Sequence, residues 1–348
     1  MTSDQTNHAV PLAAQPAIDG VLAAFKNRPL VGIGDYHGLA QQSAFYAELV
    51  RDPRFARDVG NVVVEFGGAA SQNIVDRYVA GETVHYDELR KVWTDVVGWV
   101  PTVLDLGLIR FYAEVRAVNL HLPPDHRIRV WLGEPEIDWT KIKTREELNA
   151  FLGSRDSHAA KIITDNILSK NRKALVIYGT GHFLQGLDQP SLRDLIETDY
   201  PRSLFLVVPY TGFVDAASIE AFESQFGNWP TPALVSLIKG TSLQDMLPGF
   251  QVIEVSKAHG SQELSDAQRV RLARLEIAVA GFTADALLYL GPAASLAASP
   301  IDPSIYLDLD FLKEISRRSE LQVGKPISLS DAVNTATTMP RQIRHLRG

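Results

Sequence analysis

VGIGDYHGLA, residues 31–40, is a short apolar run that passes through two glycines and then presents Asp35, Tyr36 and His37 together. Runs that are apolar almost throughout are typical of strands whose two faces are both covered in a parallel sheet. The stretch therefore predicts a buried strand, followed by a turn that carries an acid and a histidine.

Similar short runs recur along the chain and alternate with amphipathic patterns of helical period. The predicted strands are LVGIG (30–34), NVVVEF (61–66), RIRVWLG (127–133), ALVIYG (174–179), SLFLVVPY (203–210), ALVSLI (233–238), FQVIEV (250–255) and ALLYLG (286–291). The predicted helices cover residues 43–52, 108–119, 159–170, 190–199 and 266–280. This alternation predicts an α/β protein with three α/β/α layers around a mainly parallel sheet.

The domain organisation follows from where the alternation begins and where it is interrupted. We expect residues 1–28 to form an N-terminal arm and residues 29–348 to form a single α/β domain. Residues 69–120 hold two or three helical patterns in succession without a strand. We expect this excursion to be a lid-like insertion, with residues 82–105 covering a cleft that an aromatic residue such as Trp93 helps to line.

Composition restricts the function classes. The chain of 348 residues has a formal net charge of -7 and no stripe of basic and aromatic residues, so we do not expect a nucleic-acid partner. It has no cysteine, which excludes a thiolate nucleophile and a cysteine-ligated metal. We found no apolar run of about 18 residues and no signal-peptide pattern at the start, so we expect a cytoplasmic protein without a membrane span. The sequence does not indicate an oligomeric state.

Four predicted strands end in residues that can carry chemistry. The first ends in Asp35 and His37, the second in Glu65, the third in Glu134, and the fourth in GTGH, which contains His182. Ligands of open parallel sheets bind outside the carboxyl ends of the strands. An acid such as Glu65 after three valines is costly to bury unless it is paired. We therefore predict that these side chains form one site.

A dinucleotide site is the main alternative for the glycine-rich stretch. The spacing of Gly32, Gly34 and Gly38 is GxGxxxG, not the GxGxxG of that motif, and Asp35 would stand where a pyrophosphate must approach. The chain also has no GxSxG, HExxH or GxxxxGK[ST] motif. A hydrolase built on these residues would activate water directly.

As a set, GDYHG, VVVEFG and YGTGHF resemble the erythromycin esterase and ChaN-like superfamily. Arg155-Asp156 resembles an Arg-Asp helix start of that family, and Arg116 with Asn119 resembles its Arg-x-x-Asn. The resemblance implies an esterase-type hydrolase. In it His37 would be the general base, Glu65 and Asp35 would orient the histidines, His182 would stabilise an oxyanion or protonate the leaving group, and Arg155 would neutralise Glu65 or hold an anion.

The resemblance also implies that a small molecule is the substrate. We expect Tyr36, Glu134, Arg116 and Trp93 to contact it. Two alternatives remain open at this point. One is a ChaN-like protein that binds haem through Tyr36 and the histidines, without hydrolytic turnover. The other is a metal-dependent hydrolase in which His37, Glu65 and His182 hold a divalent cation.

Overall fold

The computed structural model describes residues 13–98, 105–211, 219–220, 223–224, 229–236, 283–300, 302 and 307–327. The predicted strand at 250–255, the predicted helix at 266–280 and part of the expected lid, residues 99–104, lie outside these ranges.

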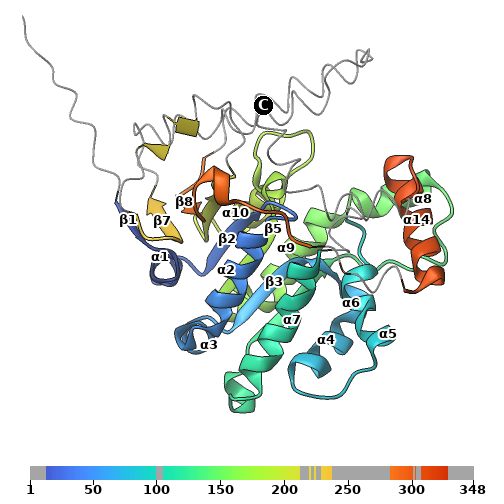
Figure 1. Cartoon of the computed structure of the whole chain (residues 1–348), viewed down its shortest axis with the longest axis horizontal. Helices are drawn as coiled ribbons and strands as arrows, with labels where there is room; N and C mark the ends of the chain where they lie inside the picture. Colours follow the sequence, from blue (N-terminus) through green and yellow to red (C-terminus); the bar gives the residue numbers. More distant parts are fainter. Residues whose placement is uncertain are drawn as a thin grey trace, which may run out of the picture.

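The described strands form one sheet, and the order of its strands differs from their order along the chain (Figure 1). The order is β1-β7-β8-β6-β2-β5-β3-β4. The pairs from β8 to β4 are all parallel, whereas β7 is antiparallel to both β1 and β8. The strands are β1 (Ala14–Pro16), β2 (Leu30–Asp35), β3 (Asn61–Gly68), β4 (Arg129–Glu134), β5 (Ala174–Gly179), β6 (Leu204–Pro209), β7 (Ala233–Ser236) and β8 (Ala286–Tyr289).

Helices cover both faces of the sheet, as the three-layer prediction requires. The helices are α1 (Ala17–Ala24), α2 (Ala40–Arg51), α3 (Pro53–Asp58), α4 (Gln72–Val79), α5 (Tyr86–Leu89), α6 (Lys91–Thr94), α7 (Leu106–Asn119), α8 (Arg145–Leu152), α9 (Arg155–Asn166), α10 (Leu192–Asp199) and α14 (Leu309–Val323). In Figure 1, α2 and α7 lie in front of the central strands.

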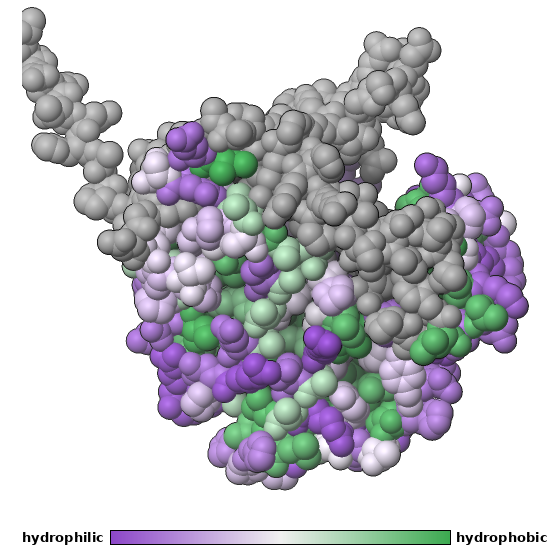
Figure 2. Space-filling view, in the orientation of Figure 1, coloured by the Kyte–Doolittle hydropathy of each residue, from purple (hydrophilic) through white to green (hydrophobic). Residues whose placement is uncertain are grey.

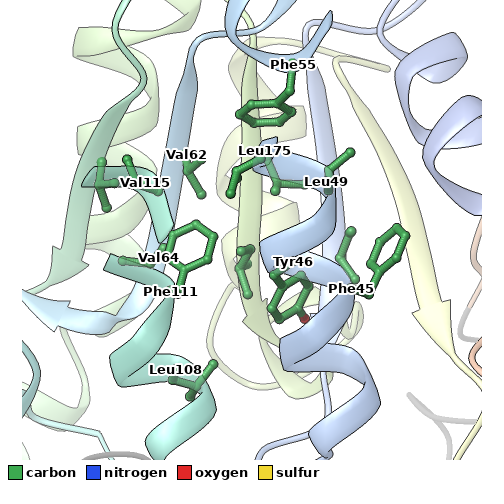
Figure 3. Packing of buried hydrophobic residues seen from close by; sticks show 14 of the residues in the cluster. Phe45, Tyr46, Leu49, Phe55, Val62, Val64, Leu108, Phe111, Val115 and Leu175 are labelled. Carbon is green, nitrogen blue, oxygen red and sulfur yellow. The ribbon is translucent and has the colours of Figure 1, made fainter. Parts of the chain in front are cut away.

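Alternate residues of each central strand belong to two separate apolar clusters. Val62 and Val64 pack with side chains of α2 and α7, as the close-up in Figure 3 shows, whereas Val63 packs with α9 on the other face. All three valines are fully buried. This burial on both faces explains why the strands read as continuous apolar runs rather than as alternating ones.

Part of the expected N-terminal arm is ordered, which corrects that prediction. Ala14–Pro16 forms β1, which pairs with β7, and α1 follows it directly. Val21 of α1 is fully buried, and a Cβ on Gly20 would lie only 2.7 Å from the Leu234 side chain. The helical spacing of small apolar residues in AIDGVLAA therefore marks a packed helix, although the alanines and prolines of the preceding residues are typical of a linker.

The excursion after β3 is helical in its described residues, as predicted. A short 3-10 turn at Ala69–Ser71, then α4, α5, α6 and α7, follow one another, and no strand occurs within residues 69–98 or 105–120. None of the described helices combines the length and apolar character needed to cross a membrane. In Figure 2, hydrophilic and hydrophobic surfaces are interspersed over the face that α2 and α7 cover.

Candidate active site

The strands that carry the predicted site residues are neighbours in the sheet. β2, β5, β3 and β4 lie side by side in that order, and all four run parallel. Asp35, His182, Glu65 and Glu134 therefore come to the same carboxyl edge, although they are far apart in sequence. The predicted convergence of His37, Glu65 and His182 is found in the structure.

Asp35 and His37 form a hydrogen-bonded pair at the end of β2. The distance from Asp35 Oδ2 to His37 Nδ1 is 2.7 Å. The turn that holds them is fixed by the buried Gln42 of α2, which accepts from the Tyr36 N–H and donates to the Gly34 carbonyl. This leaves the Nε2 atom of His37 facing away from Asp35, and the His37 side chain is 25% exposed.

Glu65 lies inside β3, not at its end, at the place where the pairing with β4 shifts register. Such irregularities re-aim side chains, and here the buried Glu65 side chain is placed between the two histidines. Glu65 Oε2 accepts from the Gly179 N–H at 2.6 Å and lies 3.7 Å from His37 Nε2. A Cβ on Gly179 would stand 3.1 Å from His37 Nε2, so glycine keeps this approach open.

His182 forms a second pair with an aspartate. It lies in the short 3-10 helix η5 (Thr180–Phe183) that follows β5, and its Nδ1 atom is hydrogen bonded to Asp156 in the first turn of α9. Its Nε2 atom lies 3.2 Å from Glu65 Oε1. The ring also packs edge-on against Tyr178, with centroids 5.4 Å apart. Two aspartate–histidine pairs thus approach one carboxylate, His37 at Oε2 and His182 at Oε1.

Arg155 joins two buried carboxylates. Its Nη2 atom donates to Glu65 Oε1 at 2.5 Å, and its Nε atom donates to Glu134 Oε1 at 2.7 Å. Glu134 is fully buried, and its other oxygen accepts from the Val97 N–H at 3.1 Å. Of the two roles predicted for Arg155, the structure shows the one in which it neutralises Glu65. Glu134 acts here as a partner of Arg155.

The segment after α6 lies beside this cluster. Besides the contact of Val97, a Cβ on Gly98 would come within 2.9 Å of Arg155 Nη2. The described end of the expected lid, residues 95–98, therefore borders the site. Its continuation, residues 99–104, lies outside the described residues, so covering of the cleft by 82–105 stays a prediction.

The charges in the cluster shift the pKa values strongly. Burial lowers the pKa of His37, but the carboxylates of Glu65 and Asp35 outweigh burial and raise it from 6.5 to about 9. In the same way Glu65 and Asp156 outweigh burial and raise the pKa of His182 to about 10. Burial acts to raise the pKa of Glu65, yet the two histidines and Arg155 hold it well below its usual range. His37, which the sequence resemblance makes the general base, therefore carries its proton near pH 7, unlike an ordinary histidine with a pKa near 6.5.

Burial is the largest influence on the pKa of Glu134. It raises the pKa of this carboxyl, and the nearby charge of Glu65 adds to the rise, although Arg155 acts in the opposite direction. For Arg155 itself burial acts to lower the pKa, but Glu134 and Glu65 raise it. The guanidinium therefore stays charged, as arginine does in nearly all proteins.

Two predicted substrate contacts lie elsewhere. Arg116, near the end of α7, donates to the carbonyls of Tyr78, Gly81 and Glu82, so it closes the C-terminal end of α4 at the amino edge of the sheet. Nearby, Asn119 bonds the backbone of Ile128, directly before β4. The expected substrate role of Arg116 is therefore wrong.

Trp93 belongs to the apolar core. It is 4% exposed and stacks on Tyr112, with ring centroids 6.1 Å apart. An aromatic residue on an amphipathic helix faces the core more readily than a cleft, and this corrects its predicted substrate contact. Tyr36 is half-buried beside the site and packs against the core under α2.

Sequence reasoning missed three residues of the site. Asp156 was seen only as part of a helix start, and its bond to His182 depends on how α9 and β5 meet. Tyr46 donates to Asp35 Oδ1 at 2.8 Å, and Gln42 holds the turn one helical turn earlier. Their i, i+4 spacing on α2 is the available signal, but the same spacing also describes ordinary core residues.

His37, Glu65 and His182, the ligands of the metal-dependent alternative, lie close together, but their arrangement differs from that of a metal centre. Within the described part of the chain, no group of three or more His, Asp or Glu side chains is arranged to hold a metal ion. Glu65 is engaged on one oxygen by Arg155 and on the other by the Gly179 N–H. A guanidinium bound to the central carboxylate is an unfavourable neighbour for a divalent cation.

Comparisons with known proteins give only distant structural likenesses. No protein-family model matches the chain. No curated protein matches it either. Among solved structures, the chain is similar to the type III effector HopBA1, with a TM-score of 0.38 and 15% identity over 59% of this chain and 88% of that one.

Two further structures are similar at the same level. A structure described as bacterial protein toxins gives a TM-score of 0.39 and 17% identity over 56% of this chain and 36% of the toxin. A Bacillus cereus protein gives a TM-score of 0.35 and 11% identity over 58% of this chain and 76% of that one. Likenesses this weak assign neither a family nor an activity to the chain.

Proposed function

We propose that the chain is a hydrolase of the erythromycin esterase-like type, which activates water with a histidine and forms no covalent intermediate. The observation that supports this proposal is the pair of aspartate–histidine dyads that face Glu65. Two oriented imidazoles around one carboxylate can supply a proton acceptor on one side of a scissile bond and a proton donor on the other. The substrate is a small molecule with an ester or a similar acyl bond.

The distances to Glu65 support different proposed roles for the two histidines. His37 Nε2 is 3.7 Å from Glu65, too far for a hydrogen bond, so its lone pair is open to a water molecule once the ring is neutral. His182 Nε2 is 3.2 Å from Glu65, so this N–H is held for donation. In the proposed reaction His37 takes a proton from water as the oxygen attacks the acyl carbon, and His182 protonates the leaving oxygen.

Direct attack by water fits the polar contacts of the two histidines. Their side-chain partners among the described residues are Asp35, Glu65 and Asp156, with no serine among them. Because the chain has no cysteine, a thiol ester cannot form either. We therefore expect no burst of product in the first turnover, since a burst reports an accumulating acyl-enzyme.

The test is turnover of a panel of chromogenic esters by the wild-type chain, by His37→Asn and by His126→Asn, each with and without a chelator. His126 is the matched control, because its side chain is 66% exposed and it lies just before β4, at the amino edge of the sheet. We expect His37→Asn to keep the melting temperature and to lose about 10²–10⁴-fold in turnover. Full turnover in His37→Asn would reject the proposal, and loss of activity on chelation would favour the metal-dependent alternative.

The pH profile separates this base from an ordinary histidine. Because the pKa of His37 is raised to about 9, the rate should climb with pH through that region and not level off near pH 6.5. A profile that is flat above pH 7 would show that another group takes the proton.

A further inference from the structure

Tyr46 connects the apolar core to the candidate site. It lies on α2 and is fully buried, and Figure 3 shows its ring among the core side chains beneath that helix. Its hydroxyl donates to Asp35 Oδ1 at 2.8 Å, while the other oxygen of Asp35 bonds His37 Nδ1 at 2.7 Å. Both oxygens of this buried carboxylate are therefore held, and the plane of the His37 ring is fixed through Asp35.

The second dyad lacks such a support. Asp156 has a side chain that is 27% exposed, against 5% for Asp35. Within the described part of the chain, His182 is the one side-chain partner of Asp156. The two dyads are thus alike in their histidine contact and differ in what holds the distal oxygen of the aspartate.

This difference has a chemical consequence. A hydrogen bond donated to a carboxylate stabilises its negative charge and weakens its pull on the proton of a neighbouring group. Tyr46 donates to Asp35 in this way. His37 should therefore release its proton more readily than His182.

We propose that Tyr46 is a positioning residue which, through Asp35, makes His37 the proton acceptor and leaves His182 as the proton donor. The inference rests on the proposed hydrolase function and deepens it. Tyr46 touches neither water nor substrate in this scheme. It acts by fixing the orientation and the basicity of the Asp35 carboxylate, so its removal changes His37 without removing any reacting atom.

The other charged groups around His37 come from β3, η5, α9 and the residue that precedes α7. Glu65 of β3 raises its pKa and His182 of η5 lowers it. Arg155 of α9 is bound to Glu65 at 2.5 Å, and Asp105 before α7 is affected by the charge of Asp35. All of these groups remain in a variant of Tyr46, so a change in the pKa of His37 in that variant results from the loss of the Tyr46 hydroxyl.

The test compares Tyr46→Phe with Tyr112→Phe. Tyr112 is a matched control, because it is equally buried and its hydroxyl donates to the Phe66 carbonyl at 2.7 Å. Each variant loses one buried hydrogen bond, so both should lower the melting temperature. The imidazole proton signals of His37 are then followed by NMR against pH in both variants, along with kcat and KM for the best ester.

In Tyr46→Phe we expect the His37 midpoint to rise by on the order of one pH unit, since Asp35 then holds the imidazolium more strongly. The alkaline rise of kcat should move by the same amount, and KM should stay unchanged. Tyr112→Phe should show neither shift. An unchanged His37 midpoint in Tyr46→Phe, or equal shifts in the two variants, would overturn the inference.

A second measurement keeps the test valid if Tyr46→Phe does not fold. Labelling all tyrosines with 3-fluorotyrosine makes the phenols stronger donors and should lower the His37 midpoint, whereas no change would overturn the inference. The NMR readout needs no turnover. A shifted midpoint in a chain that hydrolyses no ester would reject the hydrolase but keep the coupling between Tyr46 and His37.

Discussion

Replacing Glu65 by Gln removes the negative charge on which Arg155, His37 and His182 all converge. The Arg155 side chain is 15% exposed, and among the described residues Glu134 would be its one remaining charged partner. Breaking a buried ion pair by removing one member costs about 3–5 kcal/mol. We expect the free energy of unfolding at pH 7 to fall by about this amount.

The variant should also change how stability depends on pH. In the wild-type chain the folded-state pKa values of His37 and His182 lie above 6.5, so their contribution is complete below that pH and is lost as pH rises toward about 9 and 10. Each histidine gives a slope of up to about 1.4 kcal/mol per pH unit in this window. Because Glu65 is the largest raising influence on the pKa of both histidines, Glu65→Gln should have a clearly smaller slope than the wild type.

Urea unfolding followed by tryptophan fluorescence at pH 7, 8 and 9 measures both effects. Glu114→Gln is the matched control, since Glu114 pairs with Arg51 at 2.6 Å in an exposed setting. Such a pair contributes at most about 1 kcal/mol, and the control should keep the wild-type slope. Equal slopes in the wild type and in Glu65→Gln would refute the idea that this carboxylate holds the protons on the two histidines.

Three further variants test single contacts. Gly133→Ala places a Cβ only 1.8 Å from the Tyr178 hydroxyl and should lower the free energy of unfolding by about 1–3 kcal/mol. Adding Tyr178→Phe should restore much of the melting temperature, because it removes this oxygen, which has no hydrogen-bond partner among the described residues. Gly179→Ala should displace His37, lowering kcat several-fold with little change in melting temperature, and unchanged kinetics would contradict the close approach. Arg116→Met should destabilise by about 1–3 kcal/mol through lost bonds to carbonyls, yet leave kcat as it is once the protein is folded.

The apolar runs were sufficient to predict the central strands, because burial on both faces leaves a continuous signal. Val31 and Ile33 in β2, like Leu175 and Ile177 in β5, are all fully buried. β1 and α1 were missed for a related reason: their apolar residues are few and small, and their burial depends on β7, more than two hundred residues later. The order of strands depends on pairing between distant segments, which no local pattern records.

The site was predictable as far as residue type and strand end decide it. Asp35, His37, Glu65 and His182 all follow buried runs, and the carboxyl edge of a parallel sheet brings them together. Their protonation was not predictable. The pKa of His37 depends on the 3.7 Å approach of Glu65 and on the hydrogen bond of Asp35, which exist only after β5 has come between β2 and β3.

The placement of β5 between β2 and β3 also governs when this sheet can assemble on the ribosome. β2 and β3 leave the exit tunnel before β5, but they are not paired with each other in the finished sheet, because β5 lies between them and is hydrogen bonded to both. Roughly a hundred residues separate the end of β3 from β5, so at ordinary elongation rates the nascent chain waits on the order of ten seconds for its central strand. During that interval the backbone N–H and C=O groups on the inner edges of β2 and β3 have no strand to pair with, so they can pair with a wrong segment. A rare-codon cluster just before residue 174 should therefore lower the yield of folded protein more than the same cluster placed after residue 179.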